Sequence, residues 1–276
     1  MLYRGMDRAQ LDAAYNNSAA VKNYDAIKAD WHARSVRVRQ CRRGHFDLAY
    51  GDTPRQRLDL FLADNPRAPT FMFIHGGYWQ RNDKEDHGFL AEGLLAHGIN
   101  LAVVEYTLAP DAHLDHIVGE IRRAVGWLAE NLSDRGADPA RLYVGGHSAG
   151  GHLTASAMSF GFDAVKGGLA ISGLYDLEPI RLNYLNVKLG LDAEEARRNS
   201  PILCFPLVAA PLVVAYGSAE LPELCRQSVD YANGWLQRGL PGRLLAVDGA
   251  DHFTILESLA DPDGVLTREL VKMVAT

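Results

Sequence analysis

The sequence predicts an α/β fold in which a mostly parallel central sheet is covered by helices on both faces. Several short apolar runs do not alternate with polar residues, which is typical of strands buried on both faces. Stretches with helical periodicity lie between these runs, and such an alternation indicates a doubly wound sheet. A glycine-rich turn at residues 142–151 joins one apolar run to the start of a helix, as expected at the edge of such a sheet.

Length and composition fit one globular domain spanning residues 1–276, with 47% hydrophobic and 22% charged residues. The formal net charge is -6 and no lysine or arginine cluster occurs, which argues against a nucleic-acid partner. No apolar run approaches the roughly 18 residues of a membrane span, and the charged first residues do not resemble a secretion signal. Cys41, Cys204 and Cys225 are too widely spaced for a disulfide framework or a metal clip. We therefore expect a cytoplasmic protein; a homodimer is compatible with the sequence but follows from no pattern in it.

The chain begins with a segment that we expect to pack on the domain as a helical arm. Apolar residues recur at roughly helical spacing within residues 1–34. Core packing is favoured over contact with a substrate for three of its side chains, Tyr3, Tyr15 and Tyr24. Residues 35–39 and 57–62 alternate between apolar and polar side chains and predict antiparallel edge strands, with a turn at 51–54 between them.

Six apolar runs after this point predict the central strands, and four stretches between them predict helices. The predicted strands are residues 70–74, 99–104, 141–144, 168–171, 211–216 and 243–247. The predicted helices are residues 87–96, 117–132, 150–158 and 224–236. Residues 175–206 form a polar, helix-like insertion between two predicted strands. Because open sheets bind ligands at the carboxyl ends of their strands, we expect this insertion to form a small cap, although a passive connection is the alternative.

Residues 146–150 match the pattern G-x-S-x-G, with Ser148 at its centre. A serine on a sharp strand-to-helix turn is held in a strained conformation with its oxygen exposed at the edge of the sheet. The glycines avoid collisions between a β-carbon and the neighbouring backbone, and the helix directs its N–H groups towards an anion formed near the serine. Ser148 is therefore the predicted nucleophile, whereas His147 is expected to point elsewhere.

A serine hydroxyl becomes nucleophilic when a base accepts its proton, and the base in such a fold follows the last strand. His252 comes directly after the run at 243–247. Apart from His152, on the predicted helix that follows the nucleophile, it is the only histidine downstream of Ser148. His252 is therefore the predicted base.

A carboxylate should orient that base, and it should follow the strand predicted at 211–216. Glu220 is the first carboxylate after this run, whereas Glu223 is expected within the next helix, where its charge suits the helix dipole. Asp176 also follows a predicted strand and is the second candidate. We rank Glu220 first.

Hydrolysis through a tetrahedral intermediate also needs N–H groups directed at the oxyanion. One is the N–H of Ala149, and others are expected in the loop after the first central strand, from Gly76, Gly77 and Tyr78. Two adjacent glycines leave that backbone open to a close approach by a ligand. Tyr78 and Trp79 are predicted to contact the substrate.

Four segments together resemble one enzyme family. Residues 75–79 resemble the HGGYW box of the kynurenine formamidase (arylformamidase) family, and 146–150 resemble its nucleophile motif. Residues 220–228 are similar to its D-S-P-E-F-x-R-Q-S segment, whose first residue is the triad acid, and 251–253 to its D-H-F. This chain has Glu220 where the family usually has aspartate, and Leu221 where it has serine.

The resemblance implies a serine hydrolase of the α/β-hydrolase fold, related to hormone-sensitive-lipase-like esterases. It implies cleavage of an amide or ester through an acyl-enzyme, with an N-formyl aromatic amine such as N-formylkynurenine as substrate and with neither a metal nor an organic cofactor. Two alternatives stay open at this point: a short-chain carboxylesterase with the same groups, and a non-catalytic binding protein on a hydrolase fold.

Overall fold

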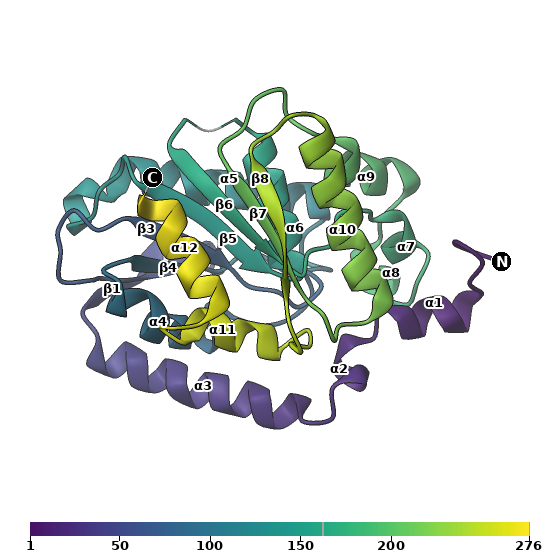
Figure 1. Cartoon of the computed structure of the whole chain (residues 1–276), viewed down its shortest axis with the longest axis horizontal. Helices are drawn as coiled ribbons and strands as arrows, with labels where there is room; N and C mark the ends of the chain where they lie inside the picture. The colour runs from purple at the N-terminus through teal and green to yellow at the C-terminus, as the bar shows by residue number, and fades with distance from the viewer. Residues whose placement is uncertain (162, 276) are drawn as a thin grey trace.

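The structure is a computed structural model that describes residues 1–161 and 163–275. One eight-stranded sheet has the order β1-β2-β4-β3-β5-β6-β7-β8, in which the pairs β1–β2 and β2–β4 are antiparallel and the others parallel (Figure 1). The strands are β1 (Gly44–Ala49), β2 (Arg57–Phe61), β3 (Thr70–Ile74), β4 (Asn100–Val104), β5 (Leu142–His147), β6 (Val165–Ile171), β7 (Leu212–Gly217) and β8 (Gly242–Val247). The predicted mostly parallel sheet is confirmed.

Helices cover both faces of this sheet. The α-helices are α1 (Arg8–Ala14), α2 (Asn17–Ala20), α3 (Tyr24–Cys41), α4 (Ala91–Ala96), α5 (Leu114–Asn131), α6 (Ala149–Ser159), α7 (Glu178–Arg181), α8 (Asn186–Leu189), α9 (Ala193–Arg198), α10 (Pro222–Gln237), α11 (Glu257–Ala260) and α12 (Val265–Ala275). Short 3₁₀ turns are η1 (Lys84–Asp86), η2 (Gly88–Leu90), η3 (Ser133–Arg135), η4 (Pro201–Leu203) and η5 (Thr254–Leu256). None of the helices described is both long enough and apolar enough to cross a membrane.

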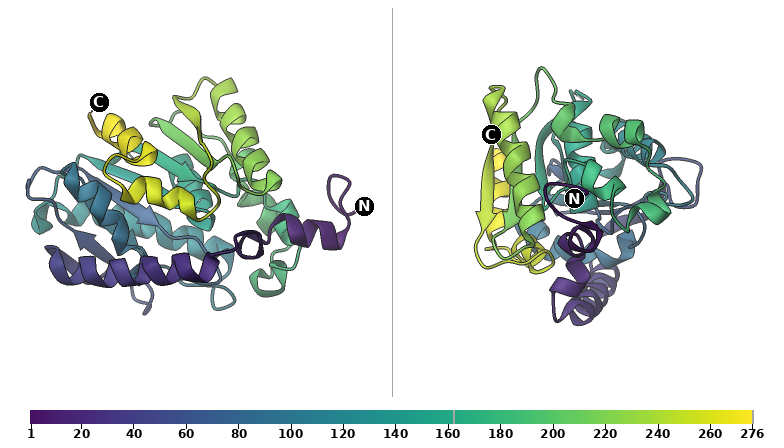
Figure 2. Two further views of the ribbon diagram at one scale, coloured as in Figure 1. Left: turned by 60° about the horizontal axis from the view of Figure 1, so that its bottom comes forward. Right: turned by 90° about the vertical axis from the view of Figure 1, so that its right-hand side faces the viewer.

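Successive residues of each central strand enter two separate cores, because strand side chains alternate between faces. On β3, Met72 and Ile74 pack with α5, α6 and α10, whereas Phe71 and Phe73 pack with α3, α4, α11 and α12. Figure 2 shows these two helical layers from further sides. Burial on both faces explains why these strands read as continuous apolar runs.

The strand predicted at residues 35–39 is wrong, since these residues lie inside α3. The buried side chains Trp31, Ser35 and Val38 recur at helical spacing. The apparent alternation arose because five residues are too few to show the helical period of 3.6. The edge strand is β1 (Gly44–Ala49) instead, and it pairs antiparallel with β2. The second predicted edge strand corresponds to β2.

The arm crosses the end of the sheet at which the parallel strands finish, and it is tightly attached there. Leu11 and Tyr15 are completely buried. The Tyr15 hydroxyl lies 3.1 Å from a carboxylate oxygen of Glu223 and accepts a 2.9 Å hydrogen bond from Gln227, both on α10. The arm is therefore a fixed part of this edge.

The insertion at 175–206 contains α7, α8, α9 and η4, and it packs beside α5 and α6. The imidazole of His152, on α6, lies 2.7 Å from the carbonyl oxygen of Asn199, and Arg198 pairs with Asp115 on α5. These contacts place the insertion on the α5–α6 side of the domain.

Candidate active site

Ser148 lies between β5 and α6 in a conformation that side-chain-bearing residues rarely adopt, with φ 58° and ψ -118°. Such a conformation costs about 1–3 kcal/mol and persists only where the surroundings impose it. The Ser148 N–H donates a hydrogen bond of 2.9 Å to the carbonyl oxygen of Ile171, on the neighbouring strand β6. The turn therefore has the geometry that the G-x-S-x-G pattern predicts.

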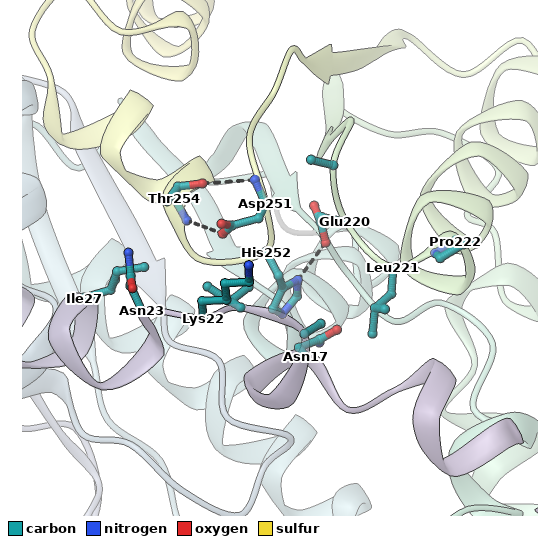
Figure 3. Close-up of a pocket in the computed structure, with 13 residues that line it drawn as sticks. Asn17, Lys22, Asn23, Ile27, Glu220, Leu221, Pro222, Asp251, His252 and Thr254 are labelled. Atoms are coloured by element: carbon teal, nitrogen blue, oxygen red, sulfur yellow. Dashed lines mark hydrogen bonds and ion pairs between the residues drawn. The ribbon is translucent and has the colours of Figure 1, made fainter. Parts of the chain in front are cut away.

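Three side chains from separate loops form one hydrogen-bonded chain. The Nε2 atom of His252 lies 3.0 Å from the Ser148 oxygen. Its Nδ1 atom lies 2.7 Å from a carboxylate oxygen of Glu220, a contact shown in Figure 3. All three residues are buried. A carboxylate can only accept, so Nδ1 carries a proton and Nε2 of the neutral ring is free to accept the serine proton. The arrangement can thus withdraw a proton from Ser148.

The second oxygen of Glu220 is held independently of His252. It accepts hydrogen bonds of 2.6 Å from the Ser172 hydroxyl and 2.6 Å from the Gly217 N–H. These bonds fix the rotation of the carboxylate, so its other oxygen faces the imidazole. Ser172 is not among the residues predicted from the sequence, although its position directly after β6 was a signal for a residue at this edge.

The two other carboxylates considered for the role of the acid, Asp176 and Glu223, contact side chains other than His252. One carboxylate oxygen of Asp176 accepts a 2.6 Å hydrogen bond from the Tyr3 hydroxyl, and Glu223 pairs with Arg226 at 2.8 Å. The geometry therefore favours Glu220 as the group that orients His252.

We expect Glu220→Gln to lower kcat for an aryl formamide by about 10⁴-fold, because the amide cannot stabilise the imidazolium that forms on His252. Steady-state kinetics of the purified variant measure this loss. Asp176→Asn is the matched control and should keep kcat within about threefold. A larger loss in the Asp176 variant than in the Glu220 variant would reverse the assignment.

The loop after β3 packs directly against the nucleophile turn. A β-carbon added at Gly76 would lie 2.8 Å from the His147 carbonyl oxygen and 3.0 Å from the Ser148 β-carbon. Gly77 has φ +110°, which favours glycine. Both glycines are thus required for this loop to approach Ser148 so closely.

Side chains also fix the direction of the peptide that joins these glycines. The Gly76 carbonyl lies 2.8 Å from Nδ1 of His75 and accepts a 3.2 Å hydrogen bond from Asn82. The other ring nitrogen of His75 lies 3.1 Å from Glu105. Because a trans peptide directs its N–H opposite to its carbonyl, the Gly77 N–H points away from these groups and stays free for a ligand.

Tyr78 and Trp79 occupy different surroundings. The Tyr78 hydroxyl donates a 2.6 Å hydrogen bond to the Tyr15 carbonyl and accepts one of 3.0 Å from Asn17. Trp79 is completely buried, and its ring lies edge-on to His152 at 5.0 Å. Trp79 lines neither of the cavities next to His252, so we assign it to packing rather than to substrate contact.

Two cavities meet at His252. The smaller has a volume of about 30 Å³ and is lined by Ser148, Gly77 and Tyr78 among others. The larger, of about 510 Å³, lies on the Glu220 side and is shown in Figure 3. Among the described residues, several from the arm line each of the two cavities, whereas none from 175–206 lines either of them.

Two side chains near the nucleophile differ from the sequence-based expectation. Tyr24, expected to pack in the core, lines the smaller cavity. His147, expected to point elsewhere, also lines it, and its Nε2–H donates a 2.6 Å hydrogen bond to the carbonyl of His252. Burial holds the pKa of His147 well below its usual value, and the nearby His252 lowers it further. His147 is therefore a neutral donor that fixes the backbone of the base.

One group of carboxylates within the described ranges could geometrically hold a metal ion: Asp83, Glu85 and Glu105. Arg55 pairs with Asp83 and Glu105, and Lys84 lies 2.7 Å from Glu85. These cations already neutralise the group, so it carries no assignment as a metal site.

Comparisons with known proteins agree with this architecture. Residues 58–164 match the BD-FAE family model. The kynurenine formamidase of Danio rerio is 32% identical, with 99% of this chain and 98% of the relative covered; that of Salmo salar is 35% identical, with 83% and 81% covered. The crystal structure of a protein from Silicibacter sp. superposes with a TM-score of 0.83 at 29% identity, covering 97% of this chain and 99% of that one. An esterase from Pyrobaculum calidifontis superposes with a TM-score of 0.71 at 21% identity, covering 93% of each chain, and supports the fold alone. The chain therefore belongs to the kynurenine formamidase family and has the α/β-hydrolase fold.

Proposed function

We propose that this hydrolase is an arylformamidase that cleaves N-formyl aromatic amines such as N-formylkynurenine, with Ser148, His252 and Glu220 as its catalytic triad. The hydrogen-bonded chain from Ser148 through His252 to Glu220 carries the proposal. The names of the relatives, kynurenine formamidases that align over most of this chain, supply the substrate class.

Acylation begins when His252 Nε2 accepts the Ser148 proton while the serine oxygen bonds to the formyl carbon. The carbonyl electron pair moves onto its oxygen, and Glu220 stabilises the imidazolium. When this intermediate collapses, the C–N bond breaks and Nε2 gives its proton to the leaving nitrogen. A water molecule then attacks the formyl-serine, with His252 again accepting and returning a proton, so that formate leaves and Ser148 is restored.

The oxyanion formed in both steps is assigned to backbone donors on two elements. Gly76 keeps the loop against the nucleophile turn, and Gly77 and Tyr78 supply N–H groups from that loop. Ala149 supplies the first N–H of α6, which has no acceptor within the helix. Loss of one such donor typically costs roughly 3–4 kcal/mol of transition-state stabilisation.

The two cavities differ in size, and we place the two parts of the substrate in them accordingly. His252 must reach the leaving nitrogen, so the aromatic amine is placed in the larger cavity, beside Glu220 and His252. The acyl group is then placed in the smaller cavity beside Ser148, whose volume is about 30 Å³. A cavity needs roughly 10–15 Å³ to hold one water molecule, so this cavity has room for only about two or three non-hydrogen atoms. This volume suits a formyl group better than a longer acyl chain.

The test is the acyl-chain preference of the wild-type enzyme on formanilide, acetanilide and butyranilide. We expect kcat/KM to fall by about 10–200-fold for the first added carbon, because the small cavity cannot receive it. Phenyl esters with the same three acyl groups are assayed alongside. A preference for acetyl or butyryl esters would instead assign a short-chain carboxylesterase, and inactivity towards every substrate would favour a non-catalytic protein.

We also propose the cytoplasm as the location of the protein and a small molecule as its binding partner. The three cysteines, none of them in a disulfide within the described residues, suit a reducing compartment. The larger cavity beside His252, of about 510 Å³, has the dimensions of a small-molecule site.

A further inference from the structure

Asn17, on the arm helix α2, shares both cavities with His252. Its side chain lies beside the imidazole in Figure 3, and the residue is 3% exposed. It is therefore placed at the boundary between the acyl group and the leaving group of a bound substrate.

The hydrogen bonds around Asn17 determine which way its amide faces. Burial raises the pKa of the Tyr78 hydroxyl well above its usual value, so this group keeps its single proton. That proton is donated to the Tyr15 carbonyl, 2.6 Å away. The Tyr78 oxygen can then only accept from Asn17, 3.0 Å away, so the NH₂ group faces Tyr78 and the oxygen Oδ1 faces elsewhere.

Among the described residues, Oδ1 of Asn17 has no hydrogen-bond partner, although it is shielded from bulk solvent. An unsatisfied buried acceptor is costly and uncommon in a folded protein. The residue lines both cavities at His252, although its Oδ1 atom is itself covered in this structure. A ligand bound there could therefore supply the missing donor once the Asn17 side chain shifts to meet it.

An amide substrate presents such a donor at this point. In the tetrahedral intermediate the nitrogen lone pair must face Nε2 of His252 to receive its proton, so the remaining N–H is directed away from the imidazole. This N–H needs an acceptor once the substrate has displaced water. An ester has an oxygen at the same place, carries no proton there and would present lone pairs to Oδ1.

We propose that Oδ1 of Asn17 accepts a hydrogen bond from the leaving-group N–H and thereby makes this enzyme favour amides over esters. The inference rests on the proposed formamidase function and identifies the residue that selects the bond to be cleaved. The arm is therefore part of the specificity machinery and not only a packing segment.

The experiment compares formanilide with phenyl formate, which differ only in N–H against O, on the wild type and on Asn17→Ala and Asn17→Leu. We expect both variants to lose about tenfold or more in kcat/KM for formanilide and to stay within about threefold for phenyl formate. Asn16→Ala is the matched control: Asn16 caps α2 by accepting from the Ala19 N–H at 3.4 Å and lines neither cavity, so the amide-to-ester ratio should not change.

Equal losses of kcat/KM on both substrates, or no loss on either, would overturn the inference. Asn17 would then act only through the structure, by its hydrogen bond to Tyr78. The ester activity of each variant reports whether the triad is intact. A wild type that hydrolyses phenyl formate but not formanilide would refute the proposed formamidase function itself, and that outcome is visible before any variant is made.

Discussion

Replacing Ser148 by alanine is expected to lower kcat/KM for formanilide by about 10⁵-fold or more, because it removes the hydroxyl that contacts His252 and that is proposed to form the acyl-enzyme. The proton acceptor would remain, since the contact of His252 with Glu220 does not depend on the serine. Background hydrolysis would then come from the proposed oxyanion donors and substrate binding alone. Initial rates at high enzyme concentration measure the loss of activity. Mass spectrometry after treatment with a fluorophosphonate measures the accompanying loss of covalent labelling.

Ser159→Ala is the matched control for this prediction. Ser159 ends the same helix α6, and its hydroxyl donates to the Ala155 carbonyl at 3.0 Å, away from both cavities. The Ser159 variant should retain kcat/KM within about threefold of the wild type, and the fluorophosphonate should still label it at one site. Labelling of the Ser148 variant at full stoichiometry would show that another residue is the nucleophile.

Gly150→Ala is expected to destabilise the fold by about 4 kcal/mol or more, or to prevent folding, which is at the upper end for single substitutions. The new β-carbon would lie 1.9 Å from the carbonyl oxygen of Ile74. That oxygen belongs to the backbone of β3, in the centre of the sheet, so it cannot turn aside as the end of a flexible side chain could. The conflict must move either α6 or β3, and Ser148 with it.

Urea unfolding followed by circular dichroism measures this effect. Gly119→Ala is the matched control, because Gly119 is exposed on α5 and a β-carbon there would meet nothing within 4 Å. Alanine has the higher helix propensity, so the control should be stabilised by up to about 1 kcal/mol. Equal free energies of unfolding for the two variants would contradict the close packing of α6 on β3.

The central sheet and the nucleophile turn were predictable from local patterns. A strand buried on both faces must be apolar throughout, which is why the run at 70–74 coincides with β3 (Thr70–Ile74). The strand–turn–helix around Ser148 needs glycine at fixed positions for steric reasons, so a short motif predicted it. Residues 35–39 show the limit of this approach, because five residues cannot distinguish a period of 2 from one of 3.6 when only Ser35 and Val38 are buried.

The sequence by itself determined the doubly wound sheet, the sharp turn at Ser148 and the glycines of the loop after β3, since each depends on neighbouring residues. Only the tertiary structure decided that Glu220 meets His252, that Ser172 holds the carboxylate, and that Asn17 on the arm borders both cavities. These contacts join residues that are distant in the chain, and their distances follow from how whole elements pack. A local pattern carries no information on such distances, because many different packings are compatible with the same strand and helix periodicity.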